Sequence, residues 1–378
     1  MNFIQTFMDG EEGLFKPNSL TPMQKMILRF VVVGLVYYLF ALVEGMLMRV
    51  YQVTPIAAIP PDQYFGMLTA HPLVGIFGST YSIVFGAFLF LVPFLMSKPL
   101  WSIKLANWTC GLIAVGTFTF WFAGFLTHYA PLYTLYWPLP ADFTQFSVWG
   151  GTFFILGIAL IMVGTVFFVL NIFRTIAYTP EGWEKQDGKG LIASALGLSG
   201  LKNLFRKNKK EHMVSLPVAA IARGTVDTAL NAGIILFTGV LILVYMIAEL
   251  LGSSLKHSSI DALLYKNWFW WGLDLIADGL VLIFVAGTWY LLATLITGKK
   301  LFMENWARAA LFVEMVVSWT VWSHHLMSDQ AQPGILKILS GEMVTAFELI
   351  TQGLAFFITL ITLWSARPLK MTNPLKFL

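Results

Sequence analysis

Charged residues are scarce in this sequence, at 12% of 378 residues, whereas 57% of the residues are hydrophobic. A water-soluble fold cannot hide so much apolar surface, so the composition excludes a soluble globular protein and indicates an integral membrane protein. Cysteine is also nearly absent, and the single Cys110 excludes an internal disulfide and a cysteine-ligated metal cluster. The first 25 residues are polar and run directly into an apolar stretch, so we expect no cleavable signal peptide.

Long apolar stretches define the expected architecture. A helix needs about 20 apolar residues to cross the hydrocarbon core, and it satisfies its own backbone hydrogen bonds there. The stretches that meet this length are Met26–Met48, Met67–Met96, Trp101–Thr127, Val148–Phe173, Val226–Leu251, Trp268–Ile296, Ala307–Met327 and Met343–Ser365. The sequence therefore predicts an all-α bundle of eight transmembrane helices, forming a single polytopic membrane domain over residues 1–378.

Lysine and arginine are concentrated in the connections after the second, fourth, sixth and eighth predicted helices. The longest of these, residues 179–216, contains the sequence RKNKK. By the positive-inside rule, these connections and both termini are cytoplasmic. We expect the basic loop at 179–216 to lie near anionic lipid headgroups rather than to bind nucleic acid. The expected location is the cytoplasmic (inner) membrane of a prokaryote, with several passes.

Histidine gives the most specific indication of chemistry. His71 lies near the start of the second predicted helix, and His324 and His325 lie at the end of the seventh. On the predicted topology all three lie toward the outer side, where helix ends can converge on one cofactor, and imidazole commonly binds haem iron or copper. The alternative is that they form hydrogen bonds at the membrane interface. Neighbours on a regular helix point about 100° apart, so joint ligation by the adjacent pair requires a local distortion or a copper ion nested between the two rings.

Carboxylates inside the predicted helices also need an explanation, because ionisable groups are costly at membrane depth. Asp274 and Asp278 lie four residues apart on one face of the sixth helix, and Glu314 and Glu348 lie in the seventh and eighth. Proton relay, cation binding, and burial as neutral groups that pack helices together are all compatible with these positions. The residue types alone do not choose among these roles.

Several motifs together resemble those of one family. The stretch PPDQYFGMLTAHPLVGIFG, which contains His71, resembles the second-helix signature of haem-copper oxidase subunit I, the cytochrome c and quinol oxidase family. The similarity continues through LANWTCGL, LYTLYWPLP and LLYKNWFWWG to VWSHHLM, which resembles the family's seventh-helix WAHHM. The resemblance implies that His71 is an axial ligand of a haem. It also implies that His324 and His325 occupy the positions of two copper-B ligands.

The sixth predicted helix departs from the family pattern. Where the family has Gly-His-Pro-Glu-Val-Tyr, this sequence reads GLDLIA from residue 272. The third copper ligand, the proton-relay glutamate and the cross-linked tyrosine are absent there, which puts copper binding in doubt. Asp274 is a candidate oxygen donor in place of the missing ligand, and two histidines with one carboxylate favour iron over copper.

The resemblance covers roughly the first eight of the family's twelve or so helices, so the haem ligands of the tenth helix are not matched. We therefore expect a divergent or split subunit I-like component of a respiratory terminal oxidase or electron-transfer complex. It would act as an oxidoreductase when completed by a partner chain that carries the missing helices and shares the haem. Other membrane subunits would complete the complex, and the electron donor would be cytochrome c, a cupredoxin or a quinol.

Two other interpretations remain at this point. One is a degenerate, structural or quinol-facing membrane subunit of a larger complex that has lost oxygen chemistry. The other is an ion transporter that uses Asp274, Asp278 and Glu314 as its polar pathway. If protons move through the chain, Asp278, Glu314 and Glu348 are the candidates for their path. No catalytic residue can be assigned from the sequence.

Overall fold

The computed structural model of the chain describes residues 20–54, 59–208, 210–252, 260–329 and 331–367, and these ranges contain helices and no strand. Within them, seven helices are long and apolar enough to cross a membrane. These helices are Pro22–Val53, Pro61–Met96, Ile103–Leu126, Val148–Ala177, Leu216–Leu250, Ala262–Thr297 and Gly334–Trp364. The prediction of an all-α integral membrane bundle is therefore confirmed.

Three of the spans contain a π-helical segment. The elements along the chain are α2 (Pro22–Val53), α3 (Pro61–Leu73), η1 (Val74–Thr80), α4 (Tyr81–Met96), α5 (Ile103–Leu126), η2 (Leu139–Ala141), α6 (Val148–Ala177), α7 (Gly188–Ala195), α8 (Leu198–Leu204), α9 (Leu216–Leu250), α10 (Ala262–Ile276), η4 (Ala277–Leu282), α11 (Ile283–Thr297), α12 (Glu304–Ser318), η5 (Val321–Leu326), α13 (Gly334–Leu336), η6 (Lys337–Met343) and α14 (Val344–Trp364). Single-turn π segments often occur at functional sites. Of these segments, η1 begins three residues after His71, and η4 follows α10, which carries Asp274.

The predicted span Ala307–Met327 does not form one long apolar helix. Its residues form α12, which has 15 residues, and then the 3-10 helix η5. Charged side chains interrupt the apolar sequence at Arg308 and Glu314, and the hydroxyl of Ser318 donates to the carbonyl of Glu314 at 2.6 Å. Such a bond to the preceding turn weakens a helix, and α12 ends at this serine. The count of eight membrane-spanning helices is therefore not confirmed.

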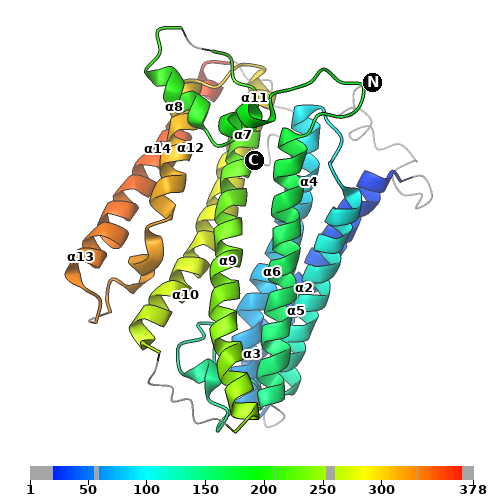
Figure 1. Ribbon diagram of the computed structural model, residues 1–378, viewed down its shortest axis with the longest axis vertical. Coiled ribbons are helices and arrows are strands. Elements are labelled where there is room, and N and C mark those ends of the chain that lie inside the picture. Colours follow the sequence, from blue (N-terminus) through cyan, green and yellow to red (C-terminus); the bar gives the residue numbers. More distant parts are fainter. Residues whose placement is uncertain (1–19, 55–58, 209, 253–259, 330, 368–378) are drawn as a thin grey trace.

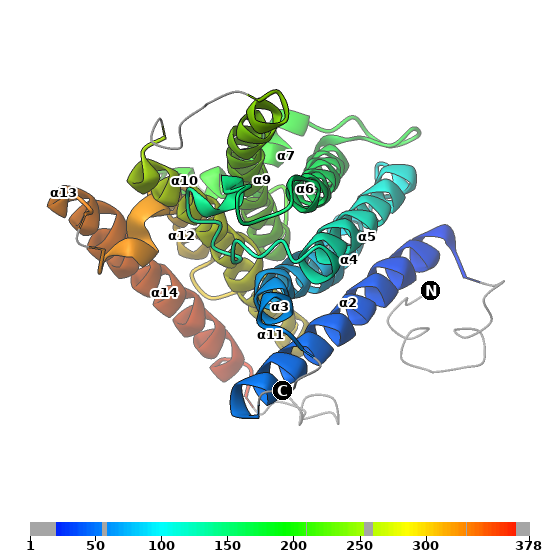
Figure 2. The ribbon, with the colours of Figure 1, turned by 90° about the horizontal axis from the view of Figure 1, so that it is seen from below.

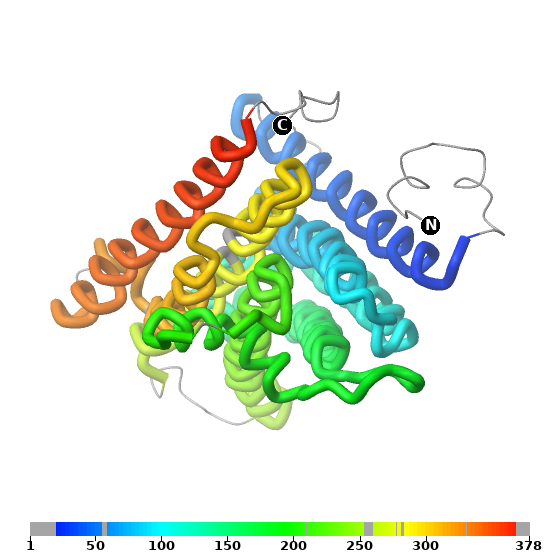
Figure 3. The backbone as a smooth tube through the Cα atoms, turned by 90° about the horizontal axis from the view of Figure 1, so that it is seen from above, coloured from blue at the N-terminus to red at the C-terminus, as the bar shows by residue number. Residues whose placement is uncertain are grey.

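Both ends of the bundle are visible in Figure 1. Helix α2 begins and α14 ends at the end of the bundle where α7 and α8 lie, and Figure 3 shows these two short helices across that end. Lys299, just after α11, donates to the carbonyl of Ser365, just after α14, so α11 and α14 end side by side. The basic segment 179–216 thus contains two helices that cover one end of the bundle.

The core lies where α4, α5, α6 and α9 meet. The rings of Phe85 and Phe168 stack there with centroids 3.8 Å apart. Helices α5 and α6 approach closely at Gly116 and Gly157, where a Cβ on either glycine would lie 2.6 Å from the other's carbonyl oxygen. Small residues permit this kind of contact between membrane helices, which are held by packing rather than by a hydrophobic drive.

Helices α2 and α14 form two outer sides of the bundle, as Figure 2 shows. Both expose large apolar side chains, for example Leu39 at 56% and Leu349 at 74%. In a bilayer such surfaces face lipid tails or further helices. The groove that contains His71 lies on the α2 side.

Candidate functional site

His71 lies at the end of α3, one residue before a proline. Pro72 has no backbone N–H and its ring crowds the preceding turn, so the regular helical pattern is disturbed here. The π segment η1 follows immediately. This sequence of elements turns the imidazole toward α2, where it is partly buried.

The imidazole of His71 is held by a backbone carbonyl. Its Nδ1 lies 2.8 Å from the carbonyl oxygen of Ala41 on α2. A carbonyl can only accept, so Nδ1 carries the hydrogen and the neutral ring keeps the lone pair of Nε2 for a ligand. Gly45 leaves room for the ring, because a Cβ there would lie 3.0 Å from Cε1 of His71.

An open groove of about 560 Å³ runs along His71. The residues that line it are Tyr38, Ala41, Leu42, Gly45, Met46, Arg49, His71, Gly75, Ser79 and Thr80. The imidazole with a free Nε2, the apolar walls and the two glycines fit the edge of a haem, since haem-ligating histidines commonly donate Nδ1–H to a carbonyl. No second histidine lines this groove in the described part of the chain.

A second group of candidate residues meets at the opposite edge of the bundle. Asp274 is buried on α10, and His324 and His325 lie on η5. In a 3-10 helix, successive residues are about 120° apart, yet the two rings here stack with centroids 5.1 Å apart. The local distortion expected for an adjacent pair is thus present, and both rings contact the same carboxylate.

The contacts at this carboxylate differ for its two oxygens. Nε2 of His325 lies 2.7 Å from Oδ1 of Asp274, while Nδ1 of His324 lies 3.4 Å from Oδ2. The hydroxyl of Thr345 donates to Gly341, so it accepts from Nε2 of His324 at 2.9 Å. A neutral His324 therefore has a bare Nδ1 that faces the bare Oδ2, and neither atom has a hydrogen-bond partner. Two facing lone pairs require a proton or a cation between them.

The donor set is two imidazoles and one carboxylate, whose ligand atoms all lie within 4.8 Å of one another. A tetrahedral ion with bonds of about 2.0–2.1 Å places two ligand atoms roughly 3.3 Å apart. Nδ1 of His324 and Oδ2 of Asp274 lie 3.4 Å apart, whereas the 2.7 Å contact between Nε2 of His325 and Oδ1 is a hydrogen bond that a metal ion would replace. A copper-B centre does not fit, because Leu273 stands where the family has its third histidine. Within the described ranges, no other histidine or cysteine joins the group.

The three candidates for a proton path lie on different elements. Asp278 lies in η4 and is 5% exposed, Glu314 lies on α12 and is 8% exposed, and Glu348 lies half-buried on α14. Glu314 lines a cavity of about 120 Å³ between α11, α12 and α14, together with Tyr290 and Thr351. The π segment separates Asp278 from Asp274, so the expected shared helical face is interrupted between them.

Sequence reasoning missed two charged residues on α9. Arg223 and Asp227 lie four residues apart, 1% and 0% exposed, and form an ion pair at 2.8 Å. The predicted span begins at Val226 and leaves Arg223 outside it, whereas α9 begins at Leu216. The signal that could have found them is the apolar sequence LPVAAIA before Arg223, which already has the character of a buried helix.

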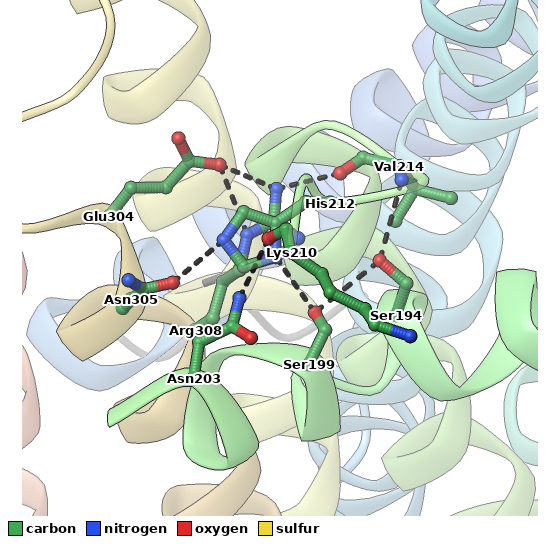
Figure 4. A network of polar contacts seen from close by, with 9 residues as sticks. All are labelled: Ser194, Ser199, Asn203, Lys210, His212, Val214, Glu304, Asn305 and Arg308. Atoms are coloured by element: carbon green, nitrogen blue, oxygen red, sulfur yellow. Dashed lines mark hydrogen bonds and ion pairs between the residues drawn. The ribbon is translucent and has the colours of Figure 1, made fainter. Parts of the chain in front are cut away.

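The remaining described histidines belong to other contacts. His128 pairs with Asp62 near the end of the bundle opposite α7 and α8, and His257 lies outside the described residues. At the α8 end, Nδ1 of His212 lies 3.0 Å from Oγ of Ser199, and Nε2 lies 2.8 Å from Oδ1 of Asn305. Figure 4 shows this network, which ties the 179–216 segment to α12.

Comparison with protein families identifies the family of the chain. The family described as Cytochrome C and Quinol oxidase polypeptide I matches residues 25–378 of the chain. The match covers nearly the whole sequence, so the chain belongs to this family, haem-copper oxidase subunit I. It is a subunit I-like respiratory oxidase component. A search of curated proteins finds no significant match.

Proposed function

We propose that the chain is a haem-associated electron-transfer component of a respiratory complex and that His71 is an axial ligand of its haem. The observation that carries the proposal is the contact between Nδ1 of His71 and the carbonyl of Ala41, which leaves Nε2 available in an open groove. Family membership supports it, because this family normally binds haem. The second axial ligand would come from a helix outside these 378 residues.

Haem, when bound, supplies a one-electron couple whose potential depends on its ligands and on the polarity around it. The residues of the chain would bind and orient the haem. The carbonyl of Ala41 fixes the tautomer and orientation of His71 and raises its basicity. Gly75 would leave room for a flat ring in the groove, and the apolar side chains of Leu42 and Met46 would pack against it. Arg49 lies at the edge of the groove, where it can pair with an acidic substituent.

The test is the reduced-minus-oxidised optical spectrum of the purified complex. His71→Ala should diminish the haem signal, since neutral alanine offers no ligand atom. His128→Ala is the matched control, because it removes a histidine that contacts Asp62 and not the groove. A complex that contains the chain and has no haem signal would contradict the proposal and favour the structural or quinol-facing subunit.

We also propose that Asp274, His324 and His325 bind a divalent metal ion, iron in preference to copper. The facing lone pairs of Nδ1 and Oδ2 support this, as does the mixed nitrogen and oxygen donor set. Elemental analysis after dialysis against ferrous iron should show metal bound to the wild type and lost in Asp274→Asn. Asp329→Asn, which changes a carboxylate paired with Lys266, serves as the control. Equal metal content in Asp274→Asn and the wild type would remove the site.

The arrangement in the membrane belongs to the same proposal. The basic segment with α7 and α8 would face the cytoplasm of a prokaryote, and so would the start of α2 and the end of α14. The exposed apolar sides of α2 and α14 would contact other membrane subunits, one of which carries the remaining helices. Cytochrome c, a cupredoxin or a quinol would donate electrons.

A further inference from the structure

Two buried amide side chains pair between α10 and the segment that follows η5. Asn267 is 7% exposed and Gln332 is 4% exposed. Nδ2 of Asn267 donates to Oε1 of Gln332 at 3.2 Å, and Nε2 of Gln332 donates to Oδ1 of Asn267 at 2.6 Å. Each amide therefore donates one hydrogen bond and accepts one, and the pair joins two segments that are 65 residues apart in sequence.

On α10, the paired amide lies on the same side of the helix as a candidate metal ligand. Asn267 precedes Asp274 by seven residues, which is about two turns of helix, so both side chains lie on one face. The helix is continuous between them, since the π segment η4 begins only at Ala277. The amide of Asn267 and the carboxylate of Asp274 therefore keep a constant separation.

On the other segment, Gln332 is connected to the element that carries the two histidines. It follows His325 by seven residues. The backbone N–H of Asp329 donates to the carbonyl of Leu326 at 3.0 Å, and the N–H of Gln332 donates to the carbonyl of Asp329 at 3.3 Å. Leu326 is the last residue of η5, so a displacement of Gln332 would also displace this short helix.

The direct contact between the histidines and the carboxylate cannot hold these segments together once an ion is bound. Nε2 of His325 lies 2.7 Å from Oδ1 of Asp274, whereas two ligand atoms of one tetrahedral ion lie roughly 3.3 Å apart. This hydrogen bond is therefore lost when the ion enters. The amide pair contains no ligand atom, so its two hydrogen bonds persist in the free and the bound site.

An ion pair links the same two segments nearer the surface. Nζ of Lys266 lies 2.5 Å from Oδ2 of Asp329, and the two side chains are 26% and 25% exposed. Water and salt screen such a pair, so it contributes little to the stability of the contact. Buried polar groups that satisfy one another fully favour a single arrangement. The spacing of α10 and η5 therefore depends on the amide pair rather than on the ion pair.

We propose that Asn267 and Gln332 are positioning residues for the metal site, because their reciprocal hydrogen bonds hold η5 at the distance from α10 at which the ligands can share one ion. The inference rests on the proposed metal site of Asp274, His324 and His325. A neutral amide pair adds no net charge, so it acts on metal affinity through geometry alone. Ligands must lie within about 0.5 Å of their productive positions, and a loosened η5 does not meet this requirement.

The test measures the affinity and the coordination of Co²⁺ in the purified complex, by equilibrium dialysis and by X-ray absorption at the cobalt edge, to which haem iron does not contribute. The double substitution Asn267→Leu with Gln332→Met replaces both amides by apolar groups of similar size, so no buried polar group loses its partner. We expect the affinity to fall about tenfold, or ~1.4 kcal/mol, and the cobalt spectrum to change. Asp329→Asn is the matched control, because it removes the ion pair between the same segments, and it should change neither.

The outcomes separate the positioning role from the metal site itself. If Asp274→Asn binds Co²⁺ like the wild type, the metal site and the inference are both wrong. If Asp274→Asn loses Co²⁺ while the double substitution keeps the wild-type affinity and spectrum, the inference alone is wrong. A lower unfolding temperature of the metal-free double variant with unchanged Co²⁺ binding would give the amides a structural role only.

A milder substitution covers the case in which the double variant does not accumulate. Gln332→Asn keeps the amide group and shortens the side chain by one methylene, so the reciprocal hydrogen bonds are stretched while the buried site stays polar. It should weaken Co²⁺ binding and change the cobalt spectrum in the same direction. Binding and spectrum equal to those of the wild type would overturn the proposal.

Discussion

Gly45 on α2 controls the position of the His71 ring, and Gly45→Ala is therefore the most discriminating small change in the groove. A Cβ at this position would lie 3.0 Å from Cε1 of His71, which is about 0.4 Å closer than ordinary van der Waals contact begins. Ala41 and Gly45 lie one turn apart on the same helix. A ring displaced from α2 by this amount lengthens its 2.8 Å bond to Ala41 to about 3.2 Å, the limit of a good hydrogen bond.

The expected result is a loss of haem affinity without a loss of folding. Disturbing the partner of a metal-ligating histidine typically costs 10–100-fold in affinity. We expect the lower end, about tenfold or ~1.4 kcal/mol, because the ring shifts rather than loses its partner. Helix propensity favours alanine over glycine by about 1 kcal/mol, so stability should not fall.

The assay is haem titration of the purified apo complex followed by absorbance. Gly111→Ala is the matched control, since it makes the same substitution on membrane helix α5, outside the groove and with no atom within 4 Å of the added methyl group. It should bind haem like the wild type. If Gly45→Ala also binds haem like the wild type, the account of how His71 is held is wrong.

Two further predictions concern the end of the bundle formed by α7 and α8. Burial, with help from a nearby arginine, lowers the pKa of His212, so the folded state prefers the neutral ring. The stability that the neutral ring contributes is complete above the unfolded pKa of about 6.5 and falls as the pH drops below that value. The unfolding temperature measured against pH should show this loss. His212→Gln should make the unfolding temperature less dependent on pH in this range. Gly200→Ala places a Cβ 2.3 Å from the side chain of Arg308 on α12, so it should lower the free energy of unfolding by about 1–3 kcal/mol in chemical denaturation. Gly233→Ala, which has no atom within 4 Å of the added Cβ, should leave this free energy unchanged. Equal effects of the two substitutions would refute the tight contact between α8 and α12.

Hydropathy alone predicted most of the membrane helices, because apolar length is the strongest constraint a bilayer imposes. The predicted span Ala307–Met327 is not confirmed as one helix, and its mean hydropathy does not reveal the charges of Arg308 and Glu314. Arg308 is fully buried because Val214 and Glu304 accept its hydrogen bonds. A local window cannot predict partners that lie 94 residues away, so the length of α12 could not be read from its own residues.

The candidate sites were predictable to different degrees. The residues Asp274, His324 and His325 stood out as costly groups near helix ends, and the structure brings them together, but the facing lone pairs depend on Thr345 and could not be foreseen. Arg223 escaped notice because two of its partners, the backbone of Asp278 and the hydroxyl of Ser318, lie on other elements. Sequence periodicity carries no signal for such contacts.

The account rests on haem ligation by His71, and a cryo-EM density map of the intact complex tests it most directly. The account predicts a flat porphyrin density in the groove beside α2, with Nε2 of His71 directed at its centre and Nδ1 still bonded to Ala41. A map in which the imidazole faces lipid or water, with no tetrapyrrole beside it, would contradict it.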